Sequence, residues 1–139
     1  MNWKLELVIV PVSDVDRAKT FYIDKAGFNL DVDHRAGDTF RVVQLTPPGS
    51  ACSITIGTAI TDAAPGSVRG LHLIVSDIEA ANAELVERGV DVSEIYHFES
   101  AQRKPGPDPQ RQDYDSFLSF SDPDGNSWMV QEVRGSTRV

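Results

Sequence analysis

The sequence predicts an α+β fold built from two βαβββ units in tandem. The first observation is an internal repeat: residues 10–34 (VPVSDVDRAKTFYIDKAGFNLDVDH) match residues 73–97 (LIVSDIEAANAELVERGVDVSEIYH), 63 positions later. The second is that each copy runs on into apolar segments joined by a turn cluster, TPPGS at residues 46–50 and DPDGN at 122–126. We therefore expect one strand, one helix and a hairpin-rich run of three strands in each half.

Each copy opens with a β-branched strand and continues into a helix of about three turns. Asp14 and Asp77 are the expected N-caps, because a side-chain carboxylate accepts hydrogen bonds from the free amides of a first helical turn. Apolar residues follow at helical spacing in both copies. They are Val15, Ala18, Phe21 and Tyr22 in the first helix, and Ile78, Ala81, Leu85 and Val86 in the second.

The last strand is entered through a sharply specified turn, residues 122–126. Proline fixes φ at the first bend, glycine accepts a positive φ, and Asp and Asn tolerate left-handed backbone. The cluster predicts a hairpin that sets the register of the final strand. That register decides which side chains of the strand share one face.

The two turn clusters are 76 positions apart, which places a 13-residue insertion in the second copy between His97 and Asp115. Its Gly-Pro turns and mixed charges predict a loop and not a strand or helix. Such a loop, residues 99–113, is either a lid over a site or simply mobile. Arg103 and Lys104 within it could hold an anionic ligand or stay solvated.

Composition limits the class of protein. A chain of 139 residues fits a single domain, residues 1–139, made of two modules at about 1–62 and 66–135. The formal charge of −8 argues against nucleic acid and anionic membranes as partners. There is no apolar run long enough to span a membrane and no signal-peptide pattern. Cys52 is the only cysteine, so we expect a cytoplasmic protein without disulfides.

The tandem repeat, with PVSDVDRAKTFY at residues 11–22 and SDPDGN at 121–126, resembles the vicinal-oxygen-chelate superfamily. That group includes glyoxalase I, extradiol dioxygenases, and fosfomycin- and bleomycin-resistance proteins, and the resemblance spans roughly residues 5–133. It implies the glyoxalase/bleomycin-resistance fold, in which two units curl mixed sheet around a cleft. It also implies a homodimer.

The resemblance further implies where a divalent metal would be held in the superfamily's enzymes. Here those four positions are Leu7, Ser53, Gly70 and Met129. Glycine has no side chain, leucine cannot coordinate, and a thioether is a poor ligand for a hard ion. We therefore expect no metal and no cofactor, which leaves open whether the protein is an enzyme.

Other residues of the same strands could contact a ligand. Residues two apart on a strand share a face, so His72 and Gln131 should lie beside Gly70 and Met129. His72 could orient a ligand or be satisfied internally by Gln131. Aromatic rings flank the insertion and would suit a flat or apolar molecule. The expected ligand-binding residues are His72, Gln131, Met129, Leu7, Ser53, Phe98 and Tyr114, with no catalytic residue assigned.

The two remaining histidines, His34 and His97, occupy equivalent strand positions. Their symmetry predicts packing or a place at the edge of the cleft, and the sequence assigns neither a carboxylate partner.

The sequence thus predicts a protein that binds a small apolar or aromatic molecule in a cleft without a metal. The alternative is an enzyme of the same superfamily, a lyase, isomerase or dioxygenase. It would use displaced metal ligands such as Glu6, His72 and Glu132, or metal-free acid–base chemistry at His72. A third possibility is a regulatory module whose cleft is filled by side chains.

Overall fold

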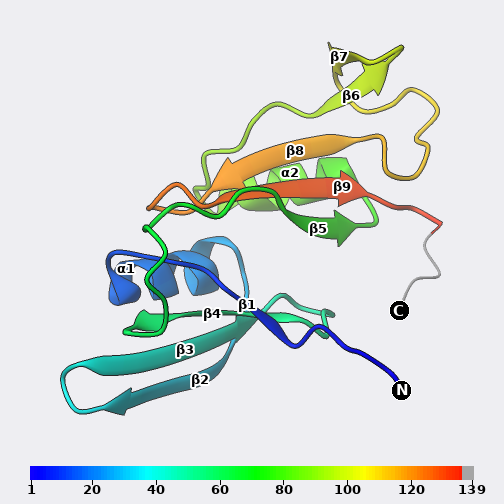
Figure 1. Ribbon diagram of the computed structural model, residues 1–139. Coiled ribbons are helices and arrows are strands. Elements are labelled where there is room, and N and C mark those ends of the chain that lie inside the picture. Colours follow the sequence, from blue (N-terminus) through cyan, green and yellow to red (C-terminus); the bar gives the residue numbers. More distant parts are fainter. Residues whose placement is uncertain (136–139) are drawn as a thin grey trace. The chain divides into compact units, whose positions relative to one another are not determined.

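The computed structural model describes residues 1–135 (Figure 1). It confirms the α+β class: two mixed sheets have the strand orders β1-β4-β3-β2 and β5-β9-β8-β6-β7. The described chain divides into two compact units, one of residues 1–68 with 122–126, the other of residues 69–121 with 127–135. That residues 1–139 form one domain stays a prediction, and residues 136–139 lie outside the described part.

The first unit has the predicted order of one strand, one helix and three strands. Its elements are β1 (Leu7–Ile9), α1 (Val15–Thr20), a π-helical continuation η1 (Phe21–Lys25), β2 (Asn29–Ala36), β3 (Phe40–Thr46) and β4 (Ser53–Thr58). Strand β1 runs parallel to β4, and β4, β3 and β2 are antiparallel neighbours.

The helix of the first unit begins where the sequence predicts. The Asp14 side chain accepts a hydrogen bond from the amide of Arg17 at 3.0 Å, which confirms it as the N-cap. Ala18, Phe21 and Tyr22 are buried, as the apolar stripe predicts. They belong to the core together with Val43, Leu45, Ile54 and Ile56 of the sheet.

The second unit contains β5 (Leu71–Val75), α2 (Ile78–Glu87), β6 (Tyr96–Glu99), β7 (Gln102–Pro105), β8 (Phe117–Ser121) and β9 (Ser127–Glu132). Strand β5 is parallel to β9, and the other neighbours are antiparallel. Asp77 caps α2 by accepting the amides of Glu79 and Ala80. Ile78 and Leu85 are buried, but Val86 is 56% exposed, so its place in the apolar stripe was predicted wrongly.

The insertion is not a plain loop, which corrects the prediction. Gln102–Pro105 forms β7, an antiparallel partner of β6. All four of its residues are exposed, so backbone hydrogen bonds and not an apolar face hold the strand. Residues 102–105 carry no alternating apolar pattern by which this strand could be recognised.

The hairpin before the last strand is confirmed, with Ser121 paired to Ser127. Its turn packs as part of the first unit. The buried Asp122 carboxylate accepts the Tyr22 hydroxyl at 2.7 Å, and the buried Asn126 amide donates to the carbonyl of Pro11 at 2.9 Å. The turn is therefore specified by tertiary hydrogen bonds as well as by backbone conformation.

Within residues 1–135 we find no helix that is both long and apolar enough to cross a membrane.

Candidate functional site

One face of the second unit's sheet is open and carries most of the predicted ligand contacts. Along β9, Trp128, Val130 and Glu132 are buried, whereas the alternate residues Ser127, Met129 and Gln131 are partly exposed. The register pairs Met129 with His72 and Gln131 with Phe117. Paired residues on neighbouring strands share a face, so these side chains lie together on what we call the open face.

His72 and Gln131 form a polar pair on the open face. Nδ1 of His72 lies 2.8 Å from Oε1 of Gln131. An amide oxygen can only accept, so Nδ1 donates, and Nε2 of the neutral imidazole is an acceptor. Gln131 in turn donates to the backbone carbonyl of Tyr114 at 3.5 Å. His72 thus has the internal partner that one of the two sequence-based alternatives named, and it also remains exposed to solvent.

Three aromatic rings pack beside this pair. The ring centroids of Tyr96 and Phe117 are 5.4 Å apart, and Phe98 lies edge-on to both, at 5.9 Å from Tyr96 and 5.7 Å from Phe117. The Tyr96 hydroxyl donates to the sulfur of Met129 at 3.0 Å. Tyr96 is buried, but Phe98 is 44% exposed. The open face therefore presents an aromatic surface next to a thioether.

Arg103 of β7 completes this surface. It pairs with Phe98 in register, and its guanidinium lies over the Tyr96 ring, 3.7 Å from the centroid. The next residue, Lys104, pairs with His97 and belongs to the opposite face. Both cations stand out in the sequence, but their opposite directions follow only from strand β7, which the sequence does not predict.

The segment before β8 is held by a buried ion pair. Glu132 is fully buried on the opposite face of β9. Its carboxylate accepts two hydrogen bonds from the Arg111 guanidinium, at 2.9 and 2.5 Å. This hydrogen-bonded pairing holds the pKa of the Glu132 carboxyl below its usual range. The backbone amide of Tyr114 donates to the carbonyl of Glu132 at 2.8 Å, so Tyr114 is tied to the same strand as Met129 and Gln131.

Leu7 and Ser53 lie in the first unit, where they are direct neighbours in the register of β1 and β4. Ser53 is buried, and its hydroxyl contacts the hydroxyl of Thr46 at 2.6 Å and the amide of Gln44 at 3.2 Å. Among the described residues, the Thr55 hydroxyl is the one buried side-chain polar atom without a partner. Contact of Leu7 and Ser53 with a ligand stays a prediction.

The donor set of the four expected metal positions does not fit a divalent ion. Met129 pairs directly with His72 and not with Gly70, but this brings one imidazole beside a thioether and no carboxylate. The alternative ligand set of Glu6, His72 and Glu132 does not fit a metal ion either, because Glu132 is on the other face of β9 and bound to Arg111. Across residues 1–135, no three His, Cys, Asp or Glu side chains are grouped to hold a metal ion.

His97 has a carboxylate partner that the sequence did not reveal. The buried ring lies 2.6 Å from Glu99 through Nε2 and 2.7 Å from the carbonyl of Gly106 through Nδ1. Both partners only accept, so both ring nitrogens donate and the imidazolium is the favoured form. The Glu99 hydrogen bond, followed by that to Gly106, raises the pKa of His97. The spacing of two residues on one strand could have signalled the pair. His34 is exposed on β2.

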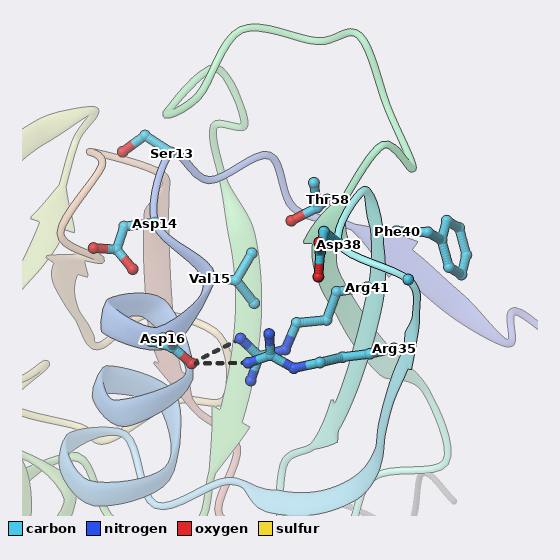
Figure 2. A pocket seen from close by; sticks show the side chains of 10 residues that line it. Ser13, Asp14, Val15, Asp16, Arg35, Asp38, Phe40, Arg41 and Thr58 are labelled. Carbon is cyan, nitrogen blue, oxygen red and sulfur yellow. Dashed lines mark hydrogen bonds and ion pairs between the residues drawn. The ribbon is translucent and has the colours of Figure 1, made fainter.

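A separate hollow of about 310 Å³ lies at the start of α1 in the first unit. Figure 2 shows the Asp16 carboxylate facing the guanidinium groups of Arg41 and Arg35, at 2.7 and 4.0 Å. Arg41 also donates two hydrogen bonds to Asp33, which lower the pKa of that carboxyl. These charges are paired with one another, so the network ties α1 to β2 and β3, and we assign it a structural role.

Comparison with known proteins agrees with this architecture. The family model described as Glyoxalase/Bleomycin resistance protein/Dioxygenase superfamily matches residues 4–130. The crystal structure of TnmS3, an antibiotic binding protein from Streptomyces sp. CB03234, is similar with 34% identity and a TM-score of 0.72, over 94% of this chain and 96% of that chain. A glyoxalase/bleomycin resistance protein from the same organism is 35% identical, with a TM-score of 0.70, over 93% and 100% of the two chains. The uncharacterized protein YetH of Bacillus subtilis is 23% identical over 126 residues, 90% of this chain and 94% of YetH.

Proposed function

Because the chain belongs to the glyoxalase/bleomycin resistance protein/dioxygenase superfamily, we propose that it binds a small, flat, aromatic or apolar molecule without a metal ion. The binding surface is the open face of the second unit's sheet. The observation that carries this proposal is the exposed Phe98 ring on the same face of the sheet as Met129 and the His72–Gln131 pair. The similarity to an antibiotic binding protein supports small-molecule binding as the role.

The residues of the open face contribute to ligand binding in different ways. Phe98 and Met129 offer apolar contact area, which contributes roughly 25 cal/mol per Å² removed from water. His72 orients the ligand through Nε2, because Gln131 occupies its other ring nitrogen. Tyr114 is positioned next to this pair by its backbone bonds to Gln131 and Glu132.

We also propose that the protein works as a homodimer in the cytoplasm. Exposed apolar side chains on β1 and β2, among them Ile9 and Val32, support the dimer, and the single, unpaired Cys52 supports a reducing compartment. Sedimentation equilibrium tests the dimer directly, and a monomer at all concentrations would contradict it.

Titration of chelator-treated protein with 2-naphthamide, a neutral flat aromatic, tests the binding function. We expect saturable binding that is weakened roughly tenfold or more by Phe98→Ala, because a lost aromatic contact is worth about 1.5–3 kcal/mol. Val86→Ala is the matched control, since it removes an exposed apolar side chain from α2. Failure of saturable binding, or equal effects of the two variants, would contradict the proposal.

The same samples separate binding from catalysis. Mass spectrometry of the recovered 2-naphthamide is expected to show an unchanged molecule. Conversion that His72→Gln abolishes would instead favour acid–base chemistry at His72.

A further inference from the structure

The charges on the open face point to the kind of ligand that it selects. The chain has 21 acidic and 13 basic residues, yet the strand residues of this face include no Asp or Glu. The acidic strand residues Glu99 and Glu132 belong to the opposite face, where each has a cationic partner. A cationic ligand would therefore find no counter-charge on these strands.

Arg103 is the cation that the open face does present. Its guanidinium makes no ion pair with a described carboxylate, although the protein as a whole is strongly acidic. The Asp115 carboxylate, which lies beside β6, accepts a hydrogen bond from the backbone amide of Phe98 at 3.3 Å and forms no ion pair with Arg103. A full positive charge is thus kept on the surface where the aromatic rings are exposed.

The guanidinium is also held in place. It lies over Tyr96, and Tyr96 is stacked on Phe117, so cation–π and ring-stacking contacts fix the position of Arg103. A guanidinium whose central carbon lies over a ring can still donate its N–H groups to a carboxylate as a planar fork. Phe98 is opposite Arg103 in register, so an aromatic ring attached to that carboxylate would pack against Phe98.

We propose that the ligand is a flat aromatic molecule carrying an anionic group, and that Arg103 is the residue that selects for the charge. This inference rests on the proposed binding function of the open face and adds the ligand's charge class to it.

Paired titrations with 2-naphthoate and 2-naphthamide test the inference, because the two probes share a ring system and differ in charge. We expect the native protein to bind the carboxylate about tenfold more tightly or better, as a charge-assisted hydrogen bond would give, with the preference shrinking at high salt. Arg103→Gln should abolish the preference while 2-naphthamide still binds. Arg103→Lys, which keeps the charge but not the fork, should retain part of it.

Lys104→Gln is the matched control, since it removes the same charge from the adjacent residue on the opposite face. It should leave the preference intact. Equal affinities for the two probes, or loss of the preference in both glutamine variants, would overturn the role of Arg103 and leave the binding function standing. Absence of binding by either probe would overturn both.

Discussion

Replacing Arg111 by methionine is the stability prediction that follows most directly from the structure. Arg111 pairs with Glu132, whose side chain is 0% exposed, while the Arg111 side chain is 23% exposed. Removing the arginine leaves a buried carboxylate with the amide of Ile78, at 2.9 Å, as its remaining partner. Breaking a buried pair in this way costs about 3–5 kcal/mol, and we expect about 3 because water can reach the arginine side.

The stability lost in Arg111→Met should depend on pH in a defined direction. In the native protein the Arg111 hydrogen bond depresses the pKa of Glu132, so the stabilisation is complete above the unfolded value of about 4.3 and disappears as pH falls through the folded pKa. In the variant, burial without a counter-charge raises this pKa, so acid protonates the carboxyl and relieves the penalty. The difference in free energy of unfolding between native protein and Arg111→Met should therefore shrink from neutral to acid pH.

Urea unfolding of both proteins at neutral and acid pH measures these quantities. Arg88→Met is the matched control, because Arg88 pairs with Glu84 at 3.7 Å on the surface and such pairs contribute at most about 1 kcal/mol. Glu132→Gln combined with Arg111→Met should be more stable than Arg111→Met alone, since no charge is then buried. A loss of stability no larger than that of Arg88→Met, or one that does not change with pH, would show that the Arg111–Glu132 pair does not stabilise the fold in this way.

Three further outcomes are expected. Glu99 and Gly106 raise the pKa of His97, so the stabilisation from His97 should be present at acid pH and lost as pH rises through the folded pKa. Chemical unfolding of His97→Asn and of native protein across this range should show the difference in their free energies of unfolding shrinking as pH rises. Gly66→Ala should lower the free energy of unfolding by about 3 kcal/mol or more, because φ is +79° and the new Cβ would lie 2.0 Å from the backbone carbonyl oxygen of Asp124. Gly70→Ala, at φ +76° but with open space around the new Cβ, should lower it by about 1 kcal/mol. Chemical unfolding compares the two variants. Removal of metal by chelation should leave the dissociation constant of 2-naphthamide unchanged, and a large rise reversed by a divalent ion would argue for a metal site.

Local chemistry made the repeated elements predictable. Asp14 and Asp77 cap their helices in the structure because capping depends on the adjacent amides alone. Val86 was misplaced since it follows Leu85 by one position, roughly 100° around the helix, which turns it away from the core. Strand β7 was missed because its polar residues are held by backbone pairing to β6.

The site was only partly predictable for a similar reason. Alternation along a strand is enough to place His72, Met129 and Gln131 on one face, and the register agrees. The direct pairing of Met129 with His72 was not foreseen, because the two halves of the repeat differ in register by two residues. The positions of Arg103 and Arg111 depend on tertiary contacts of the insertion, for which the sequence gives no periodic signal.

Binding at the open face is tested most directly by an NMR titration of protein labelled with ¹³C at the methionine methyl groups. The chain has two methionines: Met1 is fully exposed, and Met129 lies on the open face against Tyr96. We expect a bound flat aromatic, 2-naphthoate or 2-naphthamide, to shift the Met129 methyl signal through its ring current and to leave that of Met1 in place. Saturable binding that leaves the Met129 signal unmoved would place the ligand elsewhere and contradict the assignment of the open face as the binding surface.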